Sequence, residues 1–451
     1  MRIVIIGVGT IGRAILETLS GEGHAVTIID ENPDKVEALI EQYDVSGVVG
    51  NGACLDIQRE AKVRHADLVV AMTGSDEVNI LASMVAKWAG AQSTIARVRN
   101  PDYSKQISMM REELGISMVV NPEKETAEEI FNLINLPSIA QVEHFAKGKV
   151  LLVQIVVAQS SRMVGETLIS LNKKLTTKVL FCAVQRGEEV IIPTGQFVFA
   201  PGDRIHFTSD ADSLRAFLTE IGMGGSPLRH VMIVGGGRTG YYLASELSSK
   251  KYKTKLIESD KTEAEELADS LPKVTVIQAN GTSHALLREE GIESMDAFVA
   301  LTGIDEENII VSLFANNMGV KKAITRVKTD ELLGMVDELG IENTVSPKHI
   351  VADRVFSYIR ALANKRGSNI LTLYRLVGGR VEALEFAVKK MASFLGKPLK
   401  ELTLKEDCLV ACIIRGEEVI IPDGASHIEM GDGVIVVTTH KNFNDLSDIF
   451  A

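Results

Sequence analysis

Short apolar runs alternate with helix-period segments along the first part of the chain. The apolar runs lie at residues 2–6, 25–29, 45–49, 67–71, 93–98 and 117–120. Asn32 and Pro33 follow the second run and supply a helix cap and a first-turn proline. Strands that alternate with helices in this way are typical of a parallel, doubly wound sheet. We therefore expect a Rossmann-like α/β domain over residues 1–122.

The pattern changes from about Val150, where the strands become short and alternate apolar with polar positions. Arg186-Gly187 and Pro201-Gly202-Asp203 mark turns between these strands. The segment predicts a small α+β domain over residues 140–224, which is too small to serve as a catalytic substrate domain.

Both patterns occur a second time in the same order. Residues 71–80 (AMTGSDEVNI) correspond to residues 300–309 (ALTGIDEENI), and residues 186–193 (RGEEVIIP) recur at 415–422. We therefore predict a second Rossmann-like domain over residues 228–346 and a second small domain over residues 367–451. The fold class is accordingly α/β, with two tandem Rossmann-like doubly wound parallel sheets, each followed by a small α+β domain.

An amphipathic helix is predicted after each Rossmann-like domain. The first begins at Asn121-Pro122 and the second at Ser346-Pro347. Their apolar positions share one face at helical spacing. These positions are Ala127, Ile130, Phe131 and Ile134 in the first helix, and Ala352, Val355, Phe356 and Ile359 in the second. Packing on the domain's own core explains such a stripe, and the alternative is a helix that crosses to a partner subunit.

Composition and charge exclude several classes of protein. The 451 residues are 45% hydrophobic and 24% charged, which is typical of a folded globular protein. The net charge of -12 argues against a nucleic-acid partner. No apolar stretch reaches the ~18–20 residues that a membrane span needs. The first predicted strand begins at the second residue, so we expect no cleaved leader and a cytosolic protein.

The cysteines and histidines show no spacing of a disulfide frame or a zinc site. The chain has four cysteines and nine histidines, and no C-x-x-C motif. We expect Cys408 and Cys412 to lie on one face of a strand and to be buried in the core.

Candidate chemistry begins with two glycine fingerprints, each between an apolar run and a helical segment. The first is Gly7-Val-Gly9-Thr-Ile-Gly12 and the second is Gly235-Gly-Gly237-Arg-Thr-Gly240. In the dinucleotide-binding turn the first glycine permits a tight turn, the second lets backbone approach a pyrophosphate, and the third lets helix pack on strand. The helix N-terminus then presents free N–H groups to phosphate. One such hexapeptide is weak support, but two in register are strong.

An acid closes the second strand of each Rossmann-like domain, 18 residues after the last glycine. These residues are Asp30 and Glu258. A carboxylate at this position accepts hydrogen bonds from the hydroxyls of the adenosine ribose. It repels a 2′-phosphate, so NAD(H) or another adenosine nucleotide such as ATP is favoured over NADP(H). A solvated acid at the strand end is the alternative interpretation.

Further candidates lie at the carboxyl ends of the fourth and fifth strands, where open α/β sheets bind ligands. Arg97 and Arg326 are expected to donate to phosphate oxygens. Arg13 and Arg238 are further phosphate candidates, although a surface position explains Arg13 better, and Asp76 or Glu77 is expected to cap the next helix. The predicted cofactor-binding residues are Gly7, Gly9, Thr10, Ile11, Gly12, Asp30, Asn51, Thr73, Gly74 and Arg97, and Gly235, Gly237, Arg238, Thr239, Gly240, Glu258, Asn280, Thr302, Gly303 and Arg326.

The sequence shows no recognisable catalytic motif. None of the seven tyrosines has a lysine four residues later, no histidine pairs recognisably with a nucleophile, and no metal-ligand cluster appears. We therefore predict no catalytic residues, no metal and no enzymatic activity. A nucleotide that is bound without being used is naturally a regulator. The competing hypothesis is an NAD-dependent oxidoreductase with duplicated Rossmann domains, although the small lobes offer no base or substrate cavity.

The chain resembles the TrkA family, the cytosolic regulatory subunits of Trk potassium-uptake systems, which are built from two tandem RCK (regulator of potassium conductance, or KTN) modules. The resemblance covers essentially the whole chain and rests on the doubled fingerprints, Asp30 and Glu258, the Thr-Gly loops, the segment from Ala96 to Tyr103 and the repeated RGxxVIIP. It implies NAD(H) and ATP/ADP as ligands, and a membrane-embedded potassium-translocating subunit as partner.

The resemblance also implies a location on the inner face of the plasma membrane and a homo-oligomeric RCK ring, with a tetramer expected. It favours a subunit-interface role for the two amphipathic helices over packing on the core alone. One departure is that Lys328-Thr-Asp-Glu331 replaces Arg99-Asn-Pro-Asp102, so the two sites need not share a ligand. RCK modules also serve other cation channels and exchangers, and the sequence separates these systems poorly.

Overall fold

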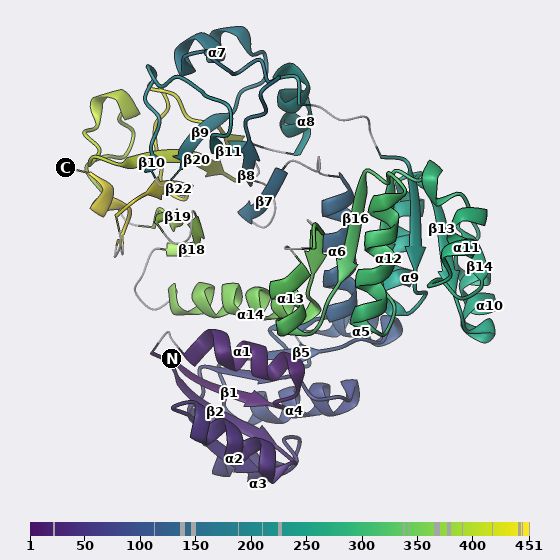
Figure 1. Ribbon diagram of the computed structural model, residues 1–451. Coiled ribbons are helices and arrows are strands. Elements are labelled where there is room, and N and C mark those ends of the chain that lie inside the picture. The colour runs from purple at the N-terminus through teal and green to yellow at the C-terminus, as the bar shows by residue number, and fades with distance from the viewer. Residues whose placement is uncertain are drawn as a thin grey trace. The chain divides into compact units, whose positions relative to one another are not determined.

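The computed structural model describes most of the chain. The described residues are 1–20, 23–111, 113–135, 140–145, 150–187, 189–209, 211–223, 228–336, 339–341, 343–364, 370–376, 380–389, 391–416, 418–440, 443 and 445–450. The chain divides into two compact units. Residues 1–136 and 227–356 form the first unit, and residues 137–226 and 357–451 form the second (Figure 1).

The first unit contains two six-stranded parallel sheets, one from each predicted Rossmann-like domain. The first has the order β3-β2-β1-β4-β5-β6. Its strands are β1 (Arg2–Ile6), β2 (Ala25–Asp30), β3 (Ser46–Val49), β4 (Leu68–Ala71), β5 (Ser93–Arg97) and β6 (Met118–Val120). All six lie within one residue of the predicted runs at each end. The parallel fold expected for the N-terminal parts is therefore confirmed.

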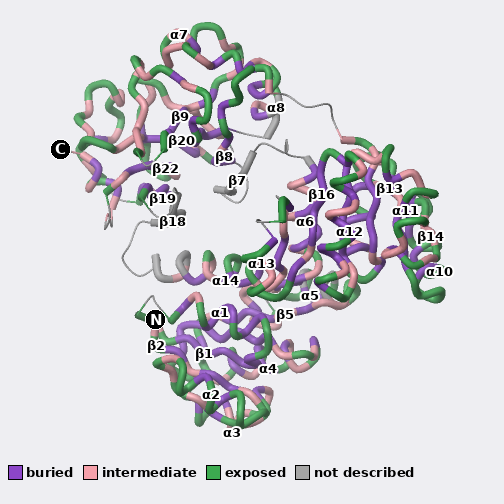
Figure 2. Tube along the Cα trace, viewed as in Figure 1, coloured by how far each residue is buried: buried purple, intermediate pink, exposed green. Residues whose placement is uncertain are grey.

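The helices of the first domain follow from local sequence signals. They are α1 (Thr10–Ser20), α2 (Pro33–Gln42), α3 (Leu55–Glu60), the 3-10 turn η1 (Val63–His65), α4 (Asp76–Ala89) and α5 (Pro101–Met110). Asn32 caps α2 by accepting from the Lys35 N–H, and Pro33 occupies the first turn, as predicted. Figure 2 shows the buried residues concentrated in the strands between these helices.

The second domain repeats this topology in the order β14-β13-β12-β15-β16-β17. Its strands are β12 (His230–Val234), β13 (Lys253–Glu258), β14 (Thr275–Gln278), β15 (Ala297–Ala300), β16 (Lys322–Arg326) and β17 (Asn343–Val345). Its helices are α9 (Arg238–Ser249), α10 (Lys261–Ser270), α11 (His284–Glu289), η3 (Ile292–Ser294), α12 (Asp305–Asn317) and α13 (Asp330–Val336).

The helix α6 (Pro122–Asn135) follows the first sheet but packs on the second domain of the same chain (Figure 1). Ala127, Ile130 and Ile134 are buried in one core with residues of β12 and α9, including Val231 and Leu243. The prediction that this stripe packs on its own domain's core was therefore wrong. Periodicity shows that a helix has an apolar face, but it does not show which domain covers that face.

Further contacts hold α6 on the second domain. The Asn121 side chain donates to the Tyr242 hydroxyl at 3.1 Å, and Phe131 meets Tyr252 edge-on with ring centroids 6.2 Å apart. The corresponding helix α14 (Pro347–Asn364) buries Val351, Ala352, Val355 and Ile359 at helical spacing. The helix that follows the first Rossmann-like domain is thus part of the hydrophobic core of the second.

The second unit contains two five-stranded antiparallel sheets with the orders β10-β9-β11-β8-β7 and β18-β19-β22-β20-β21. The first sheet has β7 (Ala140–Phe145), β8 (Val150–Val156), β9 (Leu180–Arg186), β10 (Glu189–Ile191) and β11 (Arg204–Ser209), with α7 (Leu168–Lys174) and α8 (Ala211–Glu220). The second has β18 (Ile370–Leu376), β19 (Val381–Ala387), β20 (Cys408–Arg415), β21 (Glu418–Ile420) and β22 (Gly433–Thr438), with η5 (Leu399–Glu401) and η6 (Leu446–Ile449).

One hydrophobic core joins the two antiparallel sheets. It contains Leu152 and Cys182 from the first sheet, and Ala383 and Cys412 from the second. The Thr208 hydroxyl also donates to the Ala411 carbonyl at 3.0 Å. The small domains therefore pack on each other through their sheet faces.

The expected shared face of Cys408 and Cys412 was wrong. The register of β20 against β22 shifts between Val410 and Cys412, so one residue is inserted into the strand. Ala411 and Cys412 pack in the core between the sheets, whereas Val410 faces the separate core of its own lobe. Alternation before the bulge places Cys408 on the Val410 face. Burial raises the pKa of the Cys412 thiol to about 12, which keeps it protonated.

The repeated Arg-Gly turn has the same structural role in both small domains. Asp203 is buried and accepts from Arg186 Nε and Nη2 at 2.7 Å each. Asp432 accepts from Arg415 Nε at 3.0 Å and Nη2 at 2.9 Å. A planar guanidinium matches two carboxylate oxygens, so each pair ties its hairpin to the turn before the last strand.

Among the described residues, no helix is both long and apolar enough to span a bilayer.

Candidate nucleotide-binding sites

Each glycine fingerprint joins the first strand of a parallel sheet to the next helix. Gly7 has φ +87°, and a Cβ there would lie 2.7 Å from the Thr73 backbone N. A Cβ on Gly12 would lie 2.0 Å from the Gly7 carbonyl oxygen. Gly235 and Gly240 show the same two restrictions in the second domain. The first and third glycines are therefore required by the tight turn and by helix-on-strand packing.

The second glycine of each fingerprint has a different environment. A Cβ on Gly9 or Gly237 would meet no atom within 4 Å, and the same holds for Gly74 and Gly303 of the Thr-Gly loops. These glycines border two open cavities, which we call the first pocket and the second pocket, of about 690 and 670 Å³. Bare backbone beside open space at a helix N-terminus is the arrangement that admits a phosphate.

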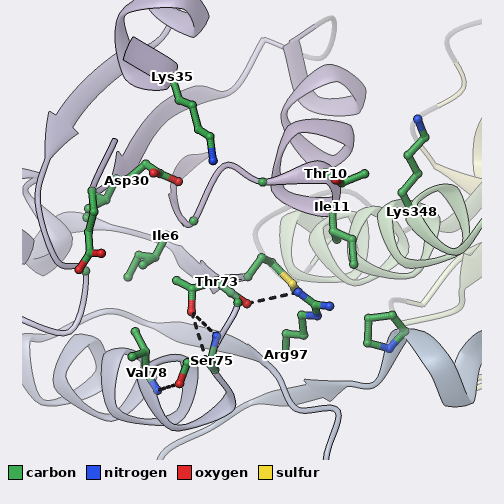
Figure 3. A pocket seen from close by; sticks show the side chains of 18 of the residues that line it. Ile6, Thr10, Ile11, Asp30, Lys35, Thr73, Ser75, Val78, Arg97 and Lys348 are labelled. Atoms are coloured by element: carbon green, nitrogen blue, oxygen red, sulfur yellow. Dashed lines mark hydrogen bonds between the residues drawn. The ribbon is translucent and has the colours of Figure 1, made fainter. Parts of the chain in front are cut away.

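The pockets bring together nearly all of the predicted residues. The first pocket, drawn in Figure 3, is lined by nine of the ten residues predicted in the first domain, and Gly12 alone lies behind the turn. The second pocket is lined by all ten residues predicted in the second domain. Both pockets lie at the carboxyl ends of the strands, where this fold is expected to bind ligands.

The strand-end acids are held by backbone. Asp30 Oδ2 accepts from the Val8 N–H at 2.9 Å, and Oδ1 accepts from the Asn32 N–H at 3.0 Å. Each carboxylate oxygen keeps acceptor capacity for a ribose hydroxyl. Glu258 Oε2 accepts from the Gly236 N–H at 2.7 Å. A Cβ on Gly236, where the first domain has Val8, would lie 2.4 Å from Leu267 Cδ1 and 3.0 Å from that oxygen, so both side chains crowd this position.

A buried asparagine links the loops around each pocket. Asn79 Oδ1 accepts from the Thr73 N–H at 2.8 Å, and its Nδ2 donates to the Arg97 carbonyl at 3.0 Å. Asn308 makes the same two bonds with Thr302 and Arg326 at 2.8 and 3.0 Å. The asparagine of the repeated motif therefore fixes the ends of the fourth and fifth strands relative to each other.

The expectation that Asp76 or Glu77 caps α4 was wrong. The cap is Ser75, whose side chain accepts from the Val78 N–H. Asp76 points instead to the next loop and accepts from the Arg99 and Asn100 N–H groups at 2.9 and 2.8 Å. An acid just inside a helix also suits the positive end of the helix dipole, so its position alone did not distinguish these roles.

Two arginines place partly buried positive charge beside the cavities. Arg97 Nη1 donates to the Thr73 carbonyl at 3.3 Å, and Arg326 Nη2 donates to the Thr302 carbonyl. The Nε atoms of both are buried and have no hydrogen-bond partner. Burial lowers the pKa of Arg97 and of Arg326, because desolvation penalises the charged form. An anion in the pocket would offset that penalty.

The other two arginine candidates differ. Arg13 is exposed and pairs with Glu17 at 3.0 Å and Gln42 at 3.2 Å, outside the first pocket, so the surface interpretation is confirmed. Arg238 lines the second pocket and is close enough to Arg97 to lower the pKa of that guanidinium.

The sequence did not reveal that the first pocket is shared between domains. It is lined by Thr239, Arg326 and Lys328 of the second domain, and by Pro347 and Lys348 at the start of α14. Glu123, at the start of α6, borders both pockets, and its Oε2 is buried without a partner. Lys35 lines the first pocket, and Glu263 and Glu307 line the second. The duplication could have revealed these charged lining residues, because aligning the two copies shows a lysine at residue 35 where the second domain has Glu263.

The arrangement suits an adenosine nucleotide. Open glycine backbone and partly buried arginines are available to phosphate, and a strand-end carboxylate is available to ribose. Within the described part of the chain, no group of three or more histidine, cysteine or acidic residues is placed to hold a metal ion. The fold and the pockets define a protein of two tandem Rossmann modules, each with a nucleotide-sized cavity and each joined to a small antiparallel lobe.

The chain belongs to the TrkA family. The TrkA-N domain matches residues 3–122 and 231–347, and the TrkA-C domain matches residues 152–222 and 383–451. A relative from Methanosarcina mazei, named Trk system potassium uptake protein TrkA homolog 1, is 32% identical with both chains fully covered. This confirms the family expected from the doubled motifs.

Solved structures show the same fold at low identity. The chain is similar to the GsuK channel bound to NAD, with a TM-score of 0.62 at 18% identity, covering 98% of this chain and 77% of that one. It is also similar to GsuK bound to ADP, with a TM-score of 0.50 at 17% identity over 81% of this chain and 69% of that one. The expected tandem of parallel-sheet and antiparallel-sheet domains is therefore confirmed.

Proposed function

We propose that this protein is the nucleotide-sensing regulatory subunit of a Trk-type potassium-uptake system. The observation that carries the proposal is the pair of pockets at the glycine turns. Each has a carboxylate for ribose and an arginine whose buried Nε lacks a partner. A binding protein needs these groups, and an enzyme would need reacting groups in addition.

The ligands proposed are NAD(H) and ATP or ADP. Asp30 and Glu258 favour a free ribose 2′-hydroxyl, which all of these molecules carry. The names of the two similar GsuK structures, one with NAD and one with ADP, support this choice of ligand classes. We assign binding to the twenty predicted residues, with Gly12 and Gly240 acting through the shape of the turn.

The proposed partner is a separate membrane-embedded subunit that translocates potassium. The protein would dock on it from the cytoplasm, at the inner face of the plasma membrane. The names of the family relatives, which are potassium uptake proteins, support this assignment. Nucleotide in the pockets would bias the assembly between two shapes, because a ligand shifts an equilibrium by its differential affinity for the two states.

The proposed assembly is a homo-oligomeric ring, with four chains expected. Each Rossmann-like domain has exposed apolar side chains on its fourth and fifth helices, and large apolar patches are typical of protein interfaces. In the first domain these are Leu81, Met84, Trp88, Met109 and Met110 on α4 and α5. In the second domain Ile310 on α12 takes the place of Leu81, and Met335 on α13 is also exposed. An exposed apolar face on each domain would let one chain contact two neighbours, as a closed ring requires.

Reconstitution with the membrane subunit tests this function. We expect a stable complex whose mass includes a closed ring of chains, and a potassium flux that changes on adding ATP, ADP, NAD⁺ or NADH. Flux that ignores all four nucleotides would contradict the proposal. Steady turnover of NADH with a carbonyl substrate would instead support the oxidoreductase. A complex that passes another ion would assign the same sensor to a different transport system.

A further inference from the structure

The two pockets are alike in volume and opposite in charge. Five cationic and three acidic described residues line the first pocket, a formal surplus of two positive charges. Two cationic and four acidic described residues line the second, a surplus of two negative charges. The first set is Lys35, Arg97, Arg326, Lys328, Lys348, Asp30, Glu31 and Glu123, and the second is Arg238, Arg326, Glu123, Glu258, Glu263 and Glu307.

Two equivalent positions account for much of the contrast. Lys35 lies five residues after Asp30, and Glu263 lies five residues after Glu258. Val78 and Glu307 are the equivalent pair four residues after Gly74 and Gly303. Figure 3 shows the Lys35 side chain extending from α2 toward the glycine turn. Its amine has no partner among the described residues, so it can meet a phosphate.

Neighbouring charges reinforce the difference. Lys328 of the second domain lines the first pocket only, and so does Arg97. Lys348 of α14 also lines it, with its amine paired to Asp330 at 2.5 Å. In the second pocket, burial and the nearby Glu258 raise the pKa of Glu263, as a crowded group of acids does. Arg238 in place of Thr10 acts in the opposite direction but does not reverse the balance. Glu123 borders both pockets and therefore does not distinguish them.

We propose that charge selects the ligands: the first pocket takes a nucleoside triphosphate, and the second takes an adenosine ligand of lower charge, such as a dinucleotide. The proposal rests on the function proposed above and specifies its ligands. ATP ends in a chain of phosphates, whereas NAD⁺ has one pyrophosphate capped by a second nucleoside. A surplus of cations favours the former, and a surplus of acids disfavours it.

Calorimetry on the full-length chain tests this with ATP and NAD⁺ as probes. A Glu258→Ala background weakens binding in the second pocket, so that the titration reports mainly on the first, and an Asp30→Ala background does the reverse. We expect the ratio of ATP to NAD⁺ affinity to be at least about tenfold higher in the first pocket, which corresponds to one charge-assisted contact. Lys35→Glu should lower that ratio about tenfold, and Glu263→Lys should raise it in the second pocket.

The matched controls reverse charge on exposed residues outside the pockets: Arg59→Glu on α3 and Glu265→Lys on α10. Both should leave the ratios unchanged. Lys35 and Glu263 are exposed first-turn residues, so their variants should fold. Equal ratios in the two pockets, unmoved by the reversals, would overturn the charge selection while nucleotide sensing stands. Absence of binding by either nucleotide in the unmodified chain would overturn both proposals.

Discussion

Gly12→Ala should destabilise the first Rossmann-like domain by about 3–4 kcal/mol. The added Cβ would lie 2.0 Å from the Gly7 carbonyl oxygen, which belongs to the backbone and cannot rotate away. Relief requires α1 to move off β1, and that movement opens the turn beneath the first pocket. Thermal unfolding followed by circular dichroism measures the loss, and nucleotide binding to the first pocket should disappear with it.

Gly9→Ala is the control for this experiment. A Cβ there meets no atom within 4 Å, so the free energy of unfolding should change by less than about 1 kcal/mol. The methyl group would nevertheless enter the space where backbone has to approach phosphate. We expect a folded protein whose first pocket binds nucleotide at least about tenfold more weakly. Similar stability losses in the two variants would contradict the assigned division of roles.

Ile130→Asp should destabilise the second Rossmann-like domain by about 4 kcal/mol or more, although Ile130 follows the first domain in sequence. The side chain is fully buried in the core that α6 shares with β12 and α9. The substitution removes apolar contacts and leaves a carboxylate without a partner in that core. Hydrogen exchange should show lost protection in β12 and α9, which carry the other half of the shared packing.

Glu128→Ala provides the comparison within the same helix. Its side chain is exposed and reaches Lys124 at 3.6 Å, an ion pair of little energetic weight. Protection of the second domain should stay as in the unmodified chain. If Ile130→Asp reduced protection only in the strands of the first domain, α6 would belong to its own module, and the shared packing would be wrong.

Local sequence predicted the parallel sheets well because the signals there are local. Apolar runs, the Asn32-Pro33 start and the glycine fingerprint each act within a few residues. The duplication repeated the apolar runs and the glycine fingerprint, whereas Asp260-Lys261 replaces Asn32-Pro33. The predicted pocket residues were also found together, because the carboxyl ends of parallel strands meet at one edge of a sheet.

The predictions that failed, and the pocket residues that were not predicted, have a different physical origin. A helical stripe on α6 does not specify the domain that covers it, so packing on the second domain could not be predicted. A bulge in β20 inverts the side-chain alternation that placed Cys408 and Cys412 together. Glu123 and Lys348 reach the pockets only through tertiary packing, and no motif near them in the sequence marks that position.

The number of adenosine nucleotides bound per chain tests the central claim most directly. Calorimetric titration of the full-length protein with ATP and with NAD⁺ should give two sites per chain in total. Asp30→Ala should weaken the first site by about 1–3 kcal/mol and Glu258→Ala the second, each leaving the other site intact, because each carboxylate holds one ribose. A chain that binds neither nucleotide, or binds both unchanged without the two carboxylates, would contradict a duplicated nucleotide sensor.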